Sequence, residues 1–108
     1  MVSYSDFQNI DLRVGRIIAA ERVNGSEKLL KLKVNLGDEL EERQIIAGIG
    51  KIYEPESLVG KDIIVVANLE PKSLMGLESE GMLLAADDES CPILLTPDKI
   101  AKPGSKIK

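Results

Sequence analysis

The segment 30–36 alternates strictly between apolar and polar residues. Its even positions are aliphatic, and its odd positions are Lys31, Lys33 and Asn35. A period of two residues is typical of a β-strand with one face in a core and the other in solvent. The sequence therefore predicts a sheet whose exposed face carries two lysines and an asparagine.

A longer strand is predicted over Ile10–Val23, and its pattern changes parity at Gly15. Before this glycine the apolar residues occupy even positions, and after it Ile17 and Ala19 occupy odd ones. A β-bulge produces such a switch and lets one strand bend to serve two halves of a barrel. We expect a bulge near Gly15, which gives this glycine a structural role.

Three more segments are predicted to be strands: Glu42–Ile49, Ile63–Leu69, and Met82–Ala86 rejoined by Ile93–Leu95. Between the third and fourth strands, residues 53–60 begin near a proline and end at a glycine, which favours a short helix. Five strands with a helix between the third and fourth is the order of the oligonucleotide-binding (OB) fold, an all-β Greek-key barrel. With no repeats and no linker, residues 1–108 are expected to form one domain with an extended or irregular tail from Thr96.

The residues needed for catalysis are scarce. The chain has no histidine, which is the commonest general base and zinc ligand. Its glycines form no phosphate-binding loop, and the acidic run Asp87–Glu89 lacks the spacing of a calcium loop. We predict a protein with no catalytic residues, no metal and no cofactor.

The cellular setting follows from what the sequence lacks. The single cysteine, Cys91, excludes an intrachain disulfide, as suits a reducing compartment. No apolar run approaches the roughly 18 residues of a membrane span, and the N-terminus has no secretory signal pattern. A cytoplasmic protein without membrane contact is expected.

The net charge of −4 constrains any interaction with nucleic acid. Proteins that find phosphate chains by bulk electrostatics are usually basic. A nucleic-acid site on this chain must therefore be a local basic patch on an acidic body. The alternative is that the charges only keep the surface soluble.

Five segments carry a family resemblance: DLRVG at 11–15, EKLLKL at 27–32, RQIIAGI at 43–49, VANLEP at 66–71 and SEGMLLA at 79–85. Together they resemble the tRNA-binding domain appended to the C-terminus of bacterial methionyl-tRNA synthetases. They are also similar to free-standing structure-specific tRNA-binding proteins, to the β-chain of archaeal methionyl-tRNA synthetases, and to the endothelial-monocyte-activating polypeptide II domain. The resemblance runs from about Asp6 to Lys108.

This resemblance implies an OB barrel with terminal extensions through which bacterial-type members pair as homodimers. It implies recognition of the folded L-shape of tRNA, and not of DNA, by a module that is either free-standing or a partner of the methionyl-tRNA synthetase catalytic chain. It assigns tRNA-binding roles to Lys28, Asn68, Ser79, Glu80 and Met82. Relatives are more basic after the strand-four turn, where this chain has Ser73 and keeps only Lys72 as a cation, which makes Lys72 a further tRNA-binding candidate.

The strand pattern adds Lys31, Lys33 and Arg43 as candidate phosphate contacts, because the second and third strands of an OB barrel commonly form its binding face. Each candidate also has a structural alternative. The lysines can belong to an ordinary polar sheet face, Asn68 can cap a turn, and Ser79 and Met82 can fasten a loop or fill a gap.

A second function remains open, that of a homodimeric secretion-associated peptide chaperone with a similar fold. Such a protein is expected to expose an apolar groove instead of a lysine-bearing face. The lysines at positions 31 and 33 favour RNA, and the acidic net charge favours the chaperone slightly. Only three residues are aromatic, which favours an RNA with paired bases over a single strand stacked on aromatic rings.

Overall fold

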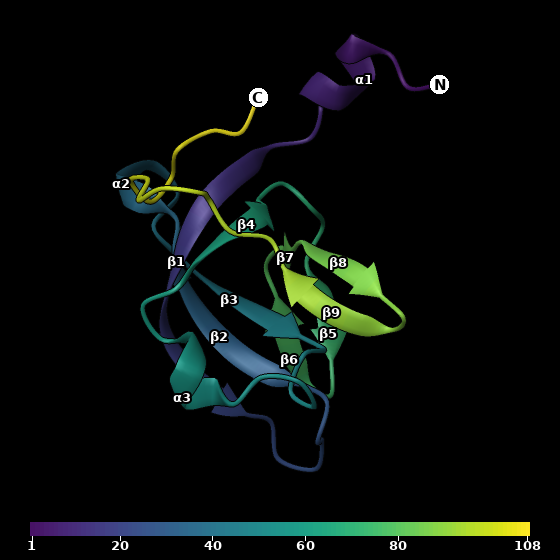
Figure 1. The fold of residues 1–108 in the computed structure, drawn as a ribbon, viewed down its shortest axis with the longest axis vertical. Coiled ribbons are helices and arrows are strands. Elements are labelled where there is room, and N and C mark those ends of the chain that lie inside the picture. Colours follow the sequence, from purple (N-terminus) through teal and green to yellow (C-terminus); the bar gives the residue numbers. More distant parts are fainter.

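The computed structural model describes residues 1–108, and helices make up 12% of them (Figure 1). The strands are β1 (Leu12–Arg22), β2 (Leu30–Asn35), β3 (Glu42–Ala47), β4 (Asp62–Val66), β5 (Lys72–Leu74), β6 (Leu77–Ser79), β7 (Met82–Leu83), β8 (Ala85–Asp88) and β9 (Cys91–Leu94). The helices are α1 (Tyr4–Gln8), α2 (Gly37–Leu40) and α3 (Pro55–Leu58). With five residues at most, no helix is long and apolar enough to cross a membrane.

Five strands form one antiparallel sheet in the order β3-β2-β1-β4-β7. The sheet curls until β3 meets the segment between β6 and β7. There the Glu80 amide donates to the Gln44 carbonyl at 2.8 Å, and the Ile46 amide donates to Ser79 Oγ at 2.9 Å. These bonds bring the two edges of the sheet together, and the expected five-stranded OB barrel is confirmed.

The core confirms the alternation in β2. Leu30, Leu32 and Val34 are completely buried, whereas Lys31 and Lys33 lie on the outer face. Aliphatic side chains from β1, β3 and β4 complete the core. Helix α3, predicted between the third and fourth strands, begins at Pro55 and packs against β1, and its Leu58 is completely buried in the core.

The bulge in β1 lies a few residues beyond the predicted place. Pairing with β4 runs without a break from Leu12 to Arg16, and the slip falls between Ile17 and Ala19 in the pairing with β2. The parity change at Gly15 has another cause. Val14 is buried but is not part of the core cluster, and its backbone pairs with the C-terminal segment (residues 101–107), so its apolar character does not mark the barrel core.

Gly15 makes room inside the barrel. A Cβ at this position would lie 2.5 Å from Val34 Cγ1 and 2.9 Å from Leu36 Cδ2. These distances are too short for any side chain, so β1 and β2 can approach only with a glycine here. Its structural role is thus close packing.

The expected fifth strand is divided in the structure. Its first residues form β7 beside β4, whereas β8 leaves the barrel and pairs with β9 as a separate hairpin. The acidic residues of β8 explain the departure, because Asp87 and Asp88 have no place in an aliphatic core. The β5–β6 hairpin is a second element that the sequence analysis did not predict.

The tail, expected to be extended or irregular, is fixed along β1 and forms one bridge pair, between Arg13 and Lys106. The Val14 amide donates to Ser105 O at 2.9 Å, and the Gly104 amide donates to Val14 O at 2.7 Å. Arg13, only 4% exposed, donates to Gly104 O and pairs with Asp11 at 2.6 Å. The hydrogen bond to Asp11 raises the pKa of Arg13 above its usual value, so this buried group stays charged.

Candidate nucleic-acid interface

The outer face of β1–β3 carries the predicted lysines and is called here the lysine face. Lys31 lies between two cross-strand neighbours, Glu21 on β1 and Ile46 on β3. Lys33 is paired in the same way with Gln44 on β3. The strict register of β2 therefore places both ammonium groups on one side of the sheet.

Both of these lysines have a carboxylate partner. Lys31 Nζ lies 2.6 Å from Glu21 Oε1, and Lys33 Nζ lies 3.8 Å from Glu42 Oε1. The pairs are exposed at the surface, where ion pairs are weak and exchange readily. Each of the two lysines can thus bind a phosphate only when its ion pair with the glutamate breaks.

Lys28 is exposed, and no carboxylate lies within ion-pair distance of its ammonium group. Its stem lies across Gly48, where a Cβ would come within 2.9 Å of Lys28 Cε. Gly48 directly follows β3, and the Gly50 amide donates to Lys28 O at 2.7 Å, so Lys28 lies where β3 ends, at the edge of the lysine face. The side chain supplies a free positive charge.

A groove of about 560 Å³ adjoins the lysine face at Ile46. Four of the predicted residues line it, namely Asn68, Lys72, Ser79 and Met82. Its walls come from β3, the β4–β5 loop, the β5–β6 hairpin and the start of β7. Lys72 and Met82 are exposed, whereas Ser79 is buried in the wall.

Three of the predicted residues use their polar groups inside the protein. Ser79 Oγ accepts from the Ile46 amide and donates to Gly81 O. Glu80 accepts from the Gln44 amide through Oε1 at 3.2 Å. Asn68 accepts from the Asp11 amide and donates to Asn9 O, so both ends of its amide hold the segment after α1.

Arg43 does not join the lysines. It is paired in register with Val34, whose side chain points into the core, so Arg43 lies on the other side of β3. Its Nη1 donates to Ala67 O at 2.8 Å and to Glu80 O at 3.3 Å. The guanidinium thus links the end of β4 to the segment that closes the barrel.

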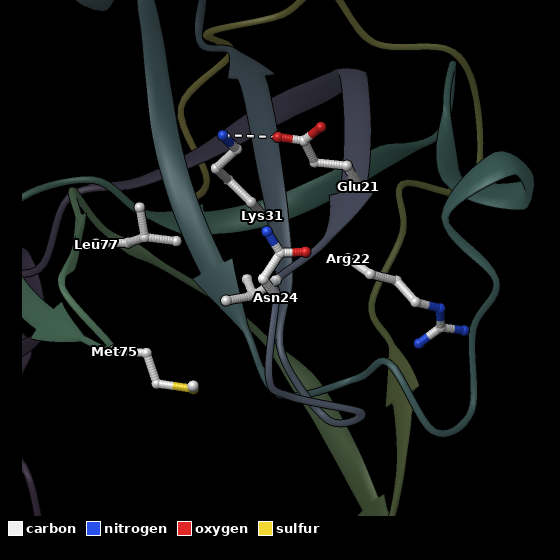
Figure 2. A pocket seen from close by; sticks show the side chains of 7 residues that line it. Glu21, Arg22, Asn24, Lys31, Met75 and Leu77 are labelled. Atoms are coloured by element: carbon white, nitrogen blue, oxygen red, sulfur yellow. Dashed lines mark ion pairs between the residues drawn. The ribbon is translucent and has the colours of Figure 1, made fainter.

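A second hollow, of about 350 Å³, contains residues that the sequence analysis missed (Figure 2). Met75 and Leu77 of the β5–β6 hairpin face Lys31 and Glu21 across it. The signal in the sequence for this hairpin is Gly76. In the structure Met75 and Gly76 both have positive φ and form the two-residue turn of the hairpin. Lys31 lines this hollow, and its cross-strand neighbour Ile46 lines the groove. Lys31 therefore lies between the hollow and the groove.

This surface combines lysine ammonium groups with a groove lined by the thioether of Met82. No group of three or more His, Cys, Asp or Glu side chains is arranged to hold a metal ion. Lysine ammonium groups suit phosphate contacts because they are mobile point charges. The exposed thioether of Met82 suits contact with the face of a base.

The five-stranded antiparallel sheet, curled into a nearly closed barrel, defines the class of this protein, an OB-fold domain. A family model described as "Putative tRNA binding domain" matches residues 12–106. The chain therefore belongs to the tRNA-binding domain family.

Curated relatives and solved structures agree with this family. The methionine–tRNA ligase of Caldanaerobacter subterraneus is 54% identical over 98% of this chain, and that of Archaeoglobus fulgidus is 48% identical over 98%. The chain spans 16% of the length of each of these two relatives.

The structure of a MetRS-related protein from Pyrococcus horikoshii matches with a TM-score of 0.92 and 35% identity, covering 100% of this chain and 98% of that one. The structure of the chaperone CsaA from Bacillus anthracis matches with a TM-score of 0.90 and 34% identity, covering 100% of this chain and 99% of that one.

Proposed function

We propose that this chain is a non-catalytic module that binds tRNA by its folded shape, either alone or with the catalytic part of methionyl-tRNA synthetase. The observation that carries the proposal is the unpaired charge of Lys28 at the edge of the lysine face, beside an open groove. The net charge of −4 provides no general attraction to RNA, so a local patch must do the work.

The nine predicted residues divide into two roles in this proposal. Those that contact tRNA are Lys28, Lys31, Lys33, Lys72 and Met82. Those that hold the shape of the groove are Arg43, Asn68, Ser79 and Glu80, because their polar groups bond within the protein.

The positions of the aromatic residues support a folded RNA as the ligand. Tyr4 and Phe7 lie on α1, and the hydroxyl of Tyr53 accepts from the Leu94 amide at 3.2 Å. None of the three lines the groove or the hollow. A site without aromatic stacking platforms suits bases that are already paired and stacked.

Within this proposal residues 1–108 act as one unit in the cytoplasm. The relatives named methionine–tRNA ligase support a synthetase as the partner, because such a module raises the concentration of tRNA near the catalytic chain. The exposed apolar residues of the N-terminal segment support a homodimer.

A second candidate function is that of a peptide chaperone. It is favoured by the groove, where Ile46, Leu69 and Met82 offer apolar surface, and by the likeness to the chaperone CsaA. The lysine face beside the groove weighs against it, because an unfolded apolar segment gains nothing from those charges.

A filter-binding titration separates the two functions. Labelled bulk tRNA and a labelled unfolded peptide are titrated with the same protein, and duplex DNA of matched charge serves as the control. We expect saturable binding of tRNA, weaker binding of DNA, and no competition by the peptide. Binding of the peptide without binding of tRNA would establish the chaperone instead.

A further inference from the structure

We propose that Glu21 and Glu42 limit the affinity of the lysine face for RNA by competing with phosphates for Lys31 and Lys33. The inference rests on the proposed function and deepens it, because it names residues that weaken binding. The two glutamates are not among the predicted site residues.

The geometry of the first pair is direct. Glu21 is the cross-strand partner of Lys31 in the β1–β2 ladder, and Lys31 Nζ lies 2.6 Å from Glu21 Oε1. Figure 2 shows the two side chains reaching toward each other beside the hollow. The carboxylate thus occupies a position around the ammonium group that a phosphate oxygen would need.

Exposure makes the exchange possible. The side chain of Glu21 is 63% exposed and that of Lys31 is 37% exposed, so ligand and solvent reach both groups. An exposed ion pair is weak enough for a phosphate to replace the carboxylate. The displaced carboxylate remains close by, however, and repels the phosphate that replaced it.

The size of this repulsion can be gauged. Two like charges about 6 Å apart in a water-like medium weaken binding by about threefold. Glu42 acts in the same way on Lys33 but more weakly, because Lys33 Nζ lies 3.8 Å from Glu42 Oε1. Lys28 has no such competitor, which makes it the strongest phosphate contact on the face.

The inference is tested with Glu21→Gln, which keeps the shape of the side chain and removes its charge. Glu56→Gln is the matched control, because Glu56 is an exposed glutamate of α3 that forms no ion pair. Both variants change the net charge of the protein by the same amount. Bulk tRNA is titrated against the parent and each variant over a range of salt concentrations.

We expect Glu21→Gln to raise tRNA affinity about threefold or more at low salt, beyond any gain from Glu56→Gln. The log–log salt slope should steepen by up to about 0.7–0.9, because Lys31 then neutralises a phosphate fully, with no carboxylate beside it. In a Lys31→Ala background the gain should fall to that of the control. A gain no larger than that of Glu56→Gln, or one that persists without Lys31, would overturn the inference.

Failure of the proposed function gives a different result. If neither the parent nor Glu21→Gln binds tRNA, the function and the inference fall together. If the parent binds tRNA and Glu21→Gln binds it equally well, only the inference falls.

Discussion

Ser79 and Met82 line the same groove but lie in opposite environments. Ser79 is 4% exposed, and its hydroxyl makes two hydrogen bonds within the protein, to the Ile46 amide and to Gly81 O. Met82 is 49% exposed and open to a ligand. Under the proposed function, one of these two residues of the same sequence motif holds the barrel closed and the other contacts the RNA.

Substitution by alanine should separate these roles. Ser79→Ala leaves the Ile46 amide without its partner and should lower the free energy of unfolding by about 1–3 kcal/mol. Met82→Ala removes an exposed side chain, so it should leave stability nearly unchanged and weaken tRNA binding severalfold. Urea unfolding and tRNA titration measure the two effects. The division of roles is wrong if Met82→Ala destabilises the protein as much as Ser79→Ala does.

At the scale of elements, β1 is held by contacts from several parts of the chain. It pairs with β4, β2 and the C-terminal segment, and Gly15 lies where β1 passes closest to the side chain of Val34. The position of β2, and with it the lysine face, depends on this close approach.

Gly15→Ala should therefore destabilise the barrel. The added Cβ meets side chains of β2 in a packed core, and overpacking of this kind costs about 1–3 kcal/mol. Thermal or urea unfolding of the variant measures the loss.

Gly60→Ala is not a suitable control, because Gly60 has a positive φ that strains any side chain. Gly48→Ala is better, since the added Cβ there meets only the flexible end of Lys28. Equal stability of Gly15→Ala and the parent would contradict this account of β1.

The sequence pattern correctly predicted the elements whose apolar residues are all buried in the barrel core. The alternation in β2 gave the correct faces, and proline and glycine marked α3. It placed the bulge of β1 at the wrong residue because two surfaces bury that strand. It missed the β5–β6 hairpin because strands of three residues are too short to show a period.

The candidate site could likewise be predicted only in part from the sequence. A period of two placed Lys31 and Lys33 on the exposed face, but it cannot show that each meets a carboxylate, since those pairs join different strands. Arg43 was expected beside the lysines, and its inward position follows from its register with Val34. The sequence also cannot show that a polar side chain, such as that of Asn68, makes its hydrogen bonds within the protein.

At the scale of the whole molecule, α1 extends away from the barrel (Figure 1). Its residues are all exposed, and Tyr4, Phe7 and Ile10 repeat at intervals of three. This spacing places their side chains on one side of the segment. A second copy of the chain would cover this apolar surface.

Light scattering at micromolar concentration should accordingly give twice the chain mass of 11.8 kDa. Replacing Tyr4 and Phe7 by serine should shift the protein toward the monomer without unfolding the barrel, because neither side chain contributes to the core. A monomer mass for the parent would contradict the homodimer.

The central claim is that a local lysine patch on an acidic protein binds tRNA, and Lys28 tests it most directly. The measurement is tRNA affinity as a function of salt for the parent, for Lys28→Ala and for Lys61→Ala. Lys61 is an exposed control whose ammonium group lies 5.8 Å from the ring centre of Tyr53, apart from the lysine face.

We predict that Lys28→Ala weakens binding to every tRNA by a similar factor and lowers the log–log slope by about one unit. Lys61→Ala should leave the slope unchanged. If Lys28→Ala binds tRNA as tightly as the parent at low salt and with the same slope, the lysine face is a solvated sheet surface and the account is wrong.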